Sequence, residues 1–462
     1  MKESGRRYEL SSIELMHAKL DEYAYAMKTV EGDSLSEIEI REFFYGGEHS
    51  CIKGGNQSIY QHNKLQWVMS SYFEEMGFKQ VRAVSYGYLD VMPPKKQDIE
   101  NEPGKYFQAY EDAVVYYERS RGKKSKEKDR IVVEVDENFH GNGMNYTIYH
   151  NLESSSLFTD WSKLADEKNF YKGKKINVSG EFLKLNDVGW DDVVLSEEKK
   201  GLIRESVAEL FENSEVFRKF GISIQRGVIL HGRPGTGKTQ ICRALAKESK
   251  CSVLYALPTD FQKNQAGVRR VTDMAKDLAP CVLIIEDMDW IALDRDAGRA
   301  GFVMELMNQM DGIEAFGDIV TVGTTNRKED LEEAVKNRPG RFDRLIEVDY
   351  PALAERVAMV QSFCSQWDIS QVNIEKIAEN LKDLSGAHIK EICKTAAIHA
   401  VYAKSFADKG EKLVVTNDHF LKAWEEVKDK DISSFLETQA KSGGNSGFGF
   451  APSRSSDPWD EL

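Results

Sequence analysis

Between about residues 187 and 350, short apolar runs alternate with stretches of helical periodicity. Each run is rich in Val, Ile and Leu and shows no polar alternation. Continuous apolar runs separated by helices are what a parallel sheet buried on both faces requires. The pattern therefore predicts an α/β domain with a parallel sheet flanked by helices, and its strands are expected at residues 228–230, 252–256, 282–285, 319–322 and 346–348.

The flanking regions carry other patterns. Residues 1–186 mix helical and strand-like stretches, which predicts an N-terminal mixed α/β domain, whereas 351–433 are helical in pattern throughout. Residues 441–462 are rich in Gly and Ser, so they hold too little apolar surface to offset their ordering entropy, and we expect a flexible tail over 434–462. Within the first region we expect helices at 11–30 and 106–119 and strands at 80–91, 130–135, 145–149 and 175–185.

The chain is acidic, with 62 Lys and Arg against 76 Asp and Glu and a net charge of −14. Such a charge repels phosphate and argues against indiscriminate coating of nucleic acid. One basic stretch, Arg119 to Arg130, could bind nucleic acid locally. Glu127 and Asp129 interrupt it, however, and a solvated loop is the favoured interpretation.

Other compositional signals are negative. The sequence has no apolar stretch near the ~20 residues that would span a bilayer, and its start lacks the apolar run of a signal peptide. We therefore expect a cytoplasmic protein with no membrane span. The six cysteines are scattered without a Cys-x-x-Cys pair, which favours reduced, buried thiols over a zinc site or a disulfide framework.

The most informative motif reads Gly-Arg-Pro-Gly-Thr-Gly-Lys-Thr and matches G-x-x-x-x-G-K-[ST]. Glycines allow backbone N–H groups to curve around phosphates, and Lys238 can reach the β and γ oxygens, while Thr239 supplies a hydroxyl to Mg²⁺. An apolar run precedes the motif and helical periodicity follows it, as a phosphate loop requires. The sequence thus predicts ATP and Mg²⁺ as cofactors, with the nucleotide held by Gly232, Pro234, Gly235, Thr236, Gly237, Lys238, Thr239 and Gln240.

About fifty residues further on, the apolar run 282–285 ends in Glu286-Asp287, followed by Asp289. Ligands of open parallel sheets bind outside the carboxyl ends of the strands, where the phosphate loop also lies. We expect Glu286 to hold Mg²⁺ or its waters and Asp287 to orient the water that attacks the phosphate.

With these motifs in place, residues 188 to 427 resemble an AAA ATPase, the family of proteasome regulatory ATPases, the ubiquitin segregase, and membrane-fusion and microtubule-severing motors. Further segments match in the family's order. They are Gly189 to Val193 beside the adenine, with Asp192; Leu306 to Gly312, similar to the inter-subunit signalling segment; Thr321 to Asn326, with Asn326 at the polar sensor; Arg338 to Arg344, the arginine-finger box; and Ser385 to Ile389 of the lid, with His388.

The resemblance implies a P-loop AAA+ core, an α-helical lid and a separate N-terminal mixed α/β domain. In the family, the residues matching Arg341 and Arg344 act on the nucleotide of the neighbouring subunit, which implies a homo-oligomeric ring, with a hexamer as the expected form. Two forked, permanently charged side chains suit the charge that develops on a γ-phosphate. The implied function is ATP hydrolysis that remodels or unfolds a macromolecular client. We expect this client to be a protein that residues 1–186 bind.

Two departures from the family pattern bear on mechanism. The usual Asp-Glu order is reversed in Glu286-Asp287, as in the branch that includes a mitochondrial Rieske-protein translocase, and Asp is one methylene shorter than Glu. We therefore expect Asp287 to activate water slowly. In the pore-loop region Phe261 is the single aromatic candidate for client contact, with a buried core side chain as the alternative.

Two other functions stay open at this point. A nucleotide-gated assembly or scaffold protein would use slow hydrolysis as a timer, and a nucleic-acid remodeller would use the basic stretch from Arg119 to Arg130. Turnover separates the first from a motor, because a motor should hydrolyse ATP at roughly 1–100 s⁻¹. Salt dependence of binding tests the second.

Overall fold

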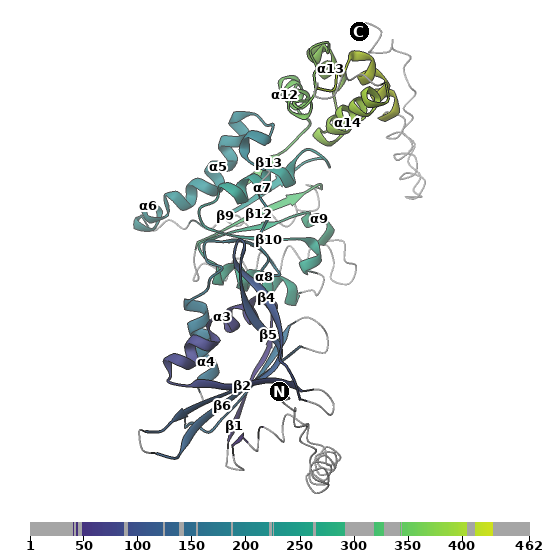
Figure 1. Cartoon of the computed structure of the whole chain (residues 1–462). Helices are drawn as coiled ribbons and strands as arrows, with labels where there is room; N and C mark the ends of the chain where they lie inside the picture. The colour runs from purple at the N-terminus through teal and green to yellow at the C-terminus, as the bar shows by residue number, and fades with distance from the viewer. Residues whose placement is uncertain are drawn as a thin grey trace, which may run out of the picture. The chain divides into compact units, whose positions relative to one another are not determined.

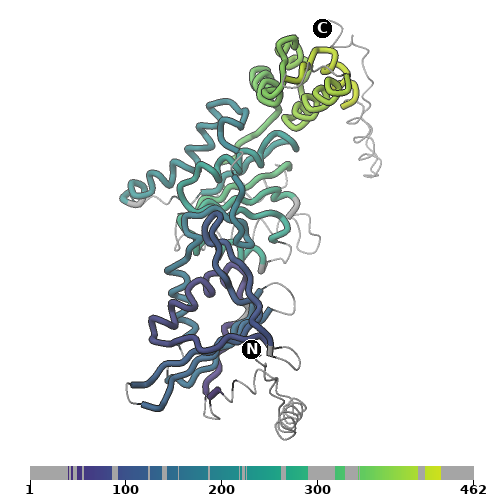
Figure 2. The backbone as a smooth tube through the Cα atoms, in the orientation of Figure 1, coloured from purple at the N-terminus to yellow at the C-terminus, as the bar shows by residue number. Residues whose placement is uncertain are grey.

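A computed structural model gives the fold of the chain (Figures 1 and 2). It describes residues 40, 43–44, 49–86, 91–122, 125–137, 143–153, 156–185, 188–220, 224, 226–261, 265–291, 318–327, 342, 344–403 and 412–427. Contacts divide the chain into two compact units. The first comprises Met1–Tyr171 with Ser179–Phe182, and the second comprises Lys172–Val178 with Leu183–Leu462. The expected helix at 11–30 and the expected tail at 434–462 lie outside the described residues.

The first unit is built on an antiparallel sheet of order β1-β7-β6-β5-β2-β3, with β4 paired to β5. Helices α3 (Ile59–Glu75) and α4 (Leu157–Glu167) share a hydrophobic core with the sheet, in which Phe73 and Trp161 are fully buried. The strands are β1 (Ser50–Gln57), β2 (Lys79–Tyr86), β3 (Val91–Met92), β4 (Lys95–Glu102), β5 (Lys105–Ser120), β6 (Lys128–Glu137) and β7 (Met144–His150).

The helix expected at 106–119 is wrong, because this segment is the long strand β5. Its residues 113–117 are all buried, so no polar alternation marks the strand. Ala113, Val115 and Tyr117 belong to the core with α3 and α4, while Val114 and Tyr116 belong to a second cluster on the other face. The strands expected at 130–135 and 145–149 are confirmed as β6 and β7, whereas the single strand expected at 80–91 is divided into β2 and β3, which pair antiparallel.

The basic stretch from Arg119 to Arg130 spans the ends of β5 and β6 and is largely engaged in ion pairs. Arg119 Nε lies 2.9 Å and Arg121 Nε 2.5 Å from the carboxylate of Asp129. Arg130 Nε lies 3.0 Å from Glu118, which also pairs with Lys128. These four cations of the described part of the stretch already have acidic partners, which reduces the positive charge that they could offer to nucleic acid.

The second unit contains a parallel sheet of order β13-β9-β12-β11-β10-β8. The five strands predicted from the apolar runs are confirmed, and with them the fold class. Figure 1 shows α5 and α7 on one side of the sheet and α8 on the other. The elements are β8 (Lys175–Asn177), η1 (Trp190–Asp192), α5 (Glu197–Glu212), α6 (Ser214–Lys219), β9 (Arg226–His231), α7 (Lys238–Glu248), β10 (Ser252–Ala256), η2 (Pro258–Phe261), α8 (Gln265–Asp277), β11 (Cys281–Ile285), α9 (Met288–Ile291), β12 (Ile319–Thr325) and β13 (Arg344–Glu347).

The strand expected at 175–185 is shorter than predicted and belongs to the parallel sheet, not to the N-terminal unit. Only β8, three residues long, is a strand, and it pairs with β10 of the parallel sheet instead of joining the antiparallel one. The chain turns back directly afterwards, with Leu183 N donating to Lys175 O at 2.9 Å. The boundaries expected at 186, 350 and 433 stay predictions.

The described residues after 350 are mostly helical, as expected for a lid. Helices α12 (Leu353–Phe363), α13 (Ile374–Asn380) and α14 (Gly386–Tyr402) pack with helical residues 417–427 around a core that includes Val360, Ile392 and Phe420. Ser385 caps α14 by accepting a hydrogen bond from His388 N.

Among the described helices, none combines the length and the apolar character needed to cross a bilayer. All six cysteines are free thiols, and five are buried as expected. The exception is Cys51, which lies on β1 and is exposed.

Candidate nucleotide-binding site

The predicted phosphate loop connects β9, which ends at His231, to α7, which begins at Lys238. Two of its glycines adopt left-handed backbone angles, with φ 78° at Gly235 and 98° at Gly237. Residues that have a Cβ atom rarely adopt these angles. At Gly232 a Cβ would lie 2.1 Å from Val348 O. The loop conformation therefore requires glycine at these positions, and Thr236 Oγ1 supports it by donating to Arg233 O at 2.9 Å.

Lys238 is 6% exposed and folds over the loop. Its Nζ donates to Gly232 O at 2.7 Å and to Arg233 O at 2.9 Å. Burial lowers the pKa of this ammonium, while the nearby carboxylates of Asp287 and Asp289 act in the opposite direction. A phosphate in the loop would offer the ammonium a charged acceptor, and charge-assisted hydrogen bonds are about twice as strong as neutral ones.

Glu286 follows β11 directly and is 7% exposed. Burial raises the pKa of its carboxyl group, although hydrogen bonds from the hydroxyls of Tyr255 and Thr239 counteract this. Its Oε1 is buried without a hydrogen-bond partner among the described residues. An orphaned carboxylate oxygen is costly unless a ligand satisfies it.

The chemistry of these donors fits Mg²⁺, which prefers oxygen ligands and keeps several waters beside one or two protein groups and substrate phosphates. Glu286 and Thr239 supply such groups. Within the described ranges, no cluster of three or more His, Cys, Asp or Glu could hold a metal. The site therefore suits a cation that shares its coordination with the nucleotide rather than one caged by the protein.

Asp287 lies next to Asn326 because β11 and β12 are neighbouring parallel strands. Asn326 Nδ2 donates to Asp287 Oδ1 at 3.5 Å, the limit of a hydrogen bond. Burial raises the pKa of the Asp287 carboxyl group, and the charge of Asp289 adds to the effect. A carboxylate with a raised pKa is a better proton acceptor near neutral pH.

The segment around η1 and the lid both reach the loop region. Gln240 Nε2 donates to Asp192 O at 2.9 Å, and Asp192 Oδ2 accepts from Gly189 N at 2.7 Å. In the lid, Ala387 N donates to Gly235 O at 3.1 Å. His388 Nδ1 lies 2.8 Å from Ser385 Oγ, at the cap of α14.

The remaining predicted residues are in part outside the described structure. Arg341 and the segment 306–312 lie outside the described residues, so their predicted roles stay predictions, and Arg344 is half-buried at the start of the edge strand β13. Phe261 ends η2 and is only 3% exposed, so it does not offer its ring to a client. For Phe261 the alternative interpretation, a core side chain, fits the structure.

Two residues near the acids were given no role in the sequence analysis. Tyr255 reaches Glu286 because β10 pairs with β11 so that Tyr255 lies opposite Ile284, two residues before Glu286 and therefore on the same face. Thr324 accepts from Asp287 N at 2.9 Å. The pairing register of the strands, which sets the residues that lie opposite one another, would have identified both residues.

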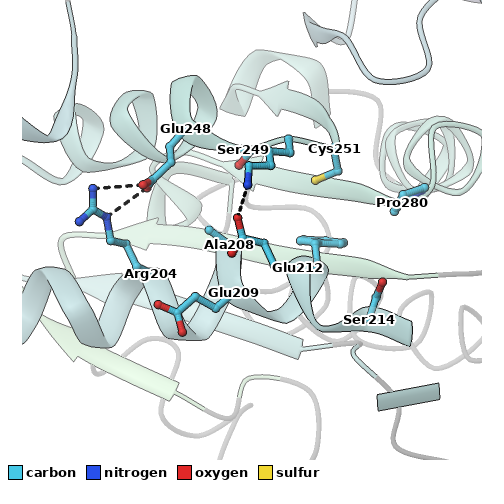
Figure 3. A pocket seen from close by; sticks show the side chains of 11 residues that line it. Arg204, Ala208, Glu209, Glu212, Ser214, Glu248, Ser249, Cys251 and Pro280 are labelled. Carbon is cyan, nitrogen blue, oxygen red and sulfur yellow. Dashed lines mark hydrogen bonds and ion pairs between the residues drawn. The ribbon is translucent and has the colours of Figure 1, made fainter. Parts of the chain in front are cut away.

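A cavity of about 540 Å³ lies elsewhere in this unit, between α5, the end of α7 and Pro280 (Figure 3). Arg204 and Glu248 pair across it at 3.1 Å, and Lys250 pairs with Glu212 at 2.6 Å. Cys251 and Pro280 precede β10 and β11, so the cavity adjoins the amino ends of these strands. It is distinct from the phosphate loop, which lies at their carboxyl ends.

A parallel sheet with a Gly-Lys-Thr loop, an acid pair and a polar sensor at its carboxyl edge, and with a helical lid on the loop, defines a P-loop nucleotide-binding domain. Residues 228–350 match the model of the AAA family, described as the ATPase family associated with various cellular activities. Over these residues the chain is similar to the AAA family.

Curated relatives are similar to about half of the chain. Three proteasome-activating nucleotidases are 32%, 33% and 32% identical, over 57%, 53% and 48% of this chain; they come from Methanocaldococcus jannaschii, Archaeoglobus fulgidus and Saccharolobus solfataricus. The chain spans 62%, 61% and 59% of the length of these relatives. The similarity therefore concerns a part of each protein.

Proposed function

We propose that the chain binds ATP with Mg²⁺ and hydrolyses it to ADP and phosphate. The observation that carries the proposal is the convergence of Lys238, Glu286, Asp287 and Asn326 at one edge of the parallel sheet, beside a loop whose conformation requires glycine at three positions. The match to the AAA family supports the same conclusion.

Each residue has a role that follows from its chemistry. The loop N–H groups and Lys238 bind the phosphates. Glu286 and the Thr239 hydroxyl would hold Mg²⁺, which supplies positive charge against the phosphate oxygens when bound. Asp287 orients a water and accepts its proton. The side-chain amide of Asn326 offers a hydrogen bond beside that water. We expect Asp192, Gln240 and His388 to contribute to nucleotide binding as well, and the hydrogen bond from Gln240 Nε2 to Asp192 O supports a shared place for the first two.

We further propose a homo-oligomeric ring, a hexamer, in which Arg341 and Arg344 reach the nucleotide of the neighbouring subunit. The position of Arg344 on an edge strand supports this, since an edge is available to a neighbour. In such a cytoplasmic ring, residues 1–186 would bind a protein client that ATP turnover remodels or unfolds. The antiparallel unit has its own hydrophobic core, which suits a separate client-binding role.

A second candidate, a nucleotide-gated assembly or scaffold protein, has two observations in its favour. Asp287 is shorter than the usual Glu, and Phe261 is buried where a threading motor would expose an aromatic ring. Turnover of roughly 1–100 s⁻¹ would favour the remodelling function, and far slower turnover the timer. A nucleic-acid remodeller is disfavoured by the ion pairs of Asp129 and Glu118 in the basic stretch.

Lys238→Ala tests the proposed site, with Lys247→Ala as the matched control on the last turn of the same helix. We expect Lys238→Ala to raise the Kd for ATP by about tenfold or more and to abolish hydrolysis, because it removes the charge that meets the phosphates. Lys247→Ala should keep both properties. A wild-type protein that binds ATP without hydrolysing it would refute the enzymatic part of the proposal.

A further inference from the structure

The turn that carries the acids docks closely on the end of β12. In the sheet Ile285 lies opposite Gly323, so the residues after each come side by side. Met288 packs directly on Gly323, where a Cβ would lie 2.3 Å from its sulfur. This close approach brings residues 286–289 against 323–326.

Thr324 holds Asp287 in an unusual backbone conformation. Asp287 has φ 45°, in the left-handed region that non-glycine residues rarely adopt. Such conformations persist only where surrounding contacts over-determine them. Here Asp287 N donates to Oγ1 of Thr324 at 2.9 Å, and Thr324 is 1% exposed, so the bond is shielded from water.

Asp289 fixes the other partner. It is 5% exposed, and its Oδ1 accepts from Asn326 N and from Thr325 Oγ1, each at 3.1 Å. The bond to Asn326 N sets the direction in which the chain leaves β12. That direction carries the Asn326 amide toward the Asp287 carboxylate.

We propose that Thr324 and Asp289 are positioning residues for hydrolysis, which hold the Asp287 carboxylate and the Asn326 amide at a fixed spacing. The inference rests on the proposed ATPase function. The reversed acid pair leaves a carboxylate that is one methylene shorter, and this clamp sets its place through backbone conformation instead of side-chain length. Neither residue is assigned a contact with the nucleotide.

Thr324→Val tests the first half, because it keeps the shape of the side chain and removes the hydroxyl. We expect kcat to fall about tenfold or more while the Kd for ADP stays within about twofold, since small misplacements of a reacting group are costly. Thr324→Ser restores the acceptor and should stay within about threefold of wild type. Thr321→Val is the matched control, because Thr321 lies on the same strand and its buried hydroxyl makes no hydrogen bond within the described part of the chain.

Asp289→Asn and Asp289→Ala test the second half and keep the inference open to refutation if Thr324→Val does not fold. The Asn side chain retains an acceptor oxygen, so it should keep a kcat about tenfold above that of the Ala variant, again with little change in ADP binding. A Thr324→Val protein with wild-type kcat, or equal kcat for Asn and Ala at 289, would overturn the clamp alone. A wild type without hydrolysis would overturn the proposed function as well.

Discussion

Replacing Gly235 by Ala perturbs the contact between the phosphate loop and the lid. The new Cβ would lie 2.7 Å from Ser385 Oγ and 2.9 Å from Ala387 Cβ, both at the start of α14. Distances this short force either the loop or the first turn of the helix to move. The residue also has φ 78°, which is strained for any side chain.

The cost has two parts. A left-handed Ala costs roughly 1–2 kcal/mol. Displacing Ser385 breaks the cap that it forms with His388 N, which adds about 1 kcal/mol. Together they correspond to a loss of roughly 30- to 150-fold in an equilibrium constant. The loss appears in nucleotide affinity if the empty loop relaxes, and in folding stability if it does not.

Calorimetric titration with ADP and denaturant unfolding measure the two terms on the same protein. Gly237→Ala is the matched comparison, because Gly237 has φ 98° and open space around its would-be Cβ, so it tests strain without the lid contact. Gly235→Ala should cost more in total, and adding Ala387→Gly should recover part of the difference. Equal total costs for Gly235→Ala and Gly237→Ala would refute the contact between lid and loop.

Three further predictions concern single side chains. Burial lowers the pKa of His62 to about 4. Because its unfolded pKa is higher, the free energy of unfolding should fall by roughly 3 kcal/mol between pH 6.5 and 4, and His62→Gln should remove that loss in pH-dependent urea melts. Phe261→Ala should lower the free energy of unfolding by about 3–5 kcal/mol, whereas the exposed Leu257→Ala should change it by less than about 0.5; equal effects would restore a surface role for Phe261. Cys51 should react with a thiol reagent faster than the five buried cysteines in the native protein, and equal rates for several thiols would contradict the burial of the others.

The parallel core was predictable because its physics leaves a direct trace in the sequence. Strands covered on both faces need continuous apolar runs, and the runs at 228–230 and 282–285 end at the loop and at the acids. The order of strands places those ends along one edge. The proximity of Lys238, Asp287 and Asn326 was therefore predictable from the sequence.

The antiparallel unit was less predictable because burial there does not follow simple periods. β5 is covered on both faces at 113–117, which removed the alternation of a half-buried strand. Helix α3 buries His62, Asn63 and Lys64 on tyrosine and acid partners, so it lacks a plain apolar stripe and was not predicted. Such positions are decided by tertiary partners that sequence pattern does not reveal.

Within the site, residue types were predictable but their mutual support was not. Asp289 stood out as a third acid, yet its hydrogen bonds to Thr325 and Asn326 depend on the register of β11 and β12. The left-handed Asp287 and its bond to Thr324 leave no mark on composition or spacing. These features depend on the three-dimensional arrangement of the strands and turns.

ATP hydrolysis by Asp287→Asn, measured beside its equilibrium affinity for ATP, tests the central claim most directly. If Asp287 accepts the proton of the attacking water, the variant should bind ATP within about threefold of wild type. It should hydrolyse ATP at least about a hundredfold more slowly, because general base catalysis contributes at least that factor. Hydrolysis by the variant at the wild-type rate would contradict the assignment of Asp287.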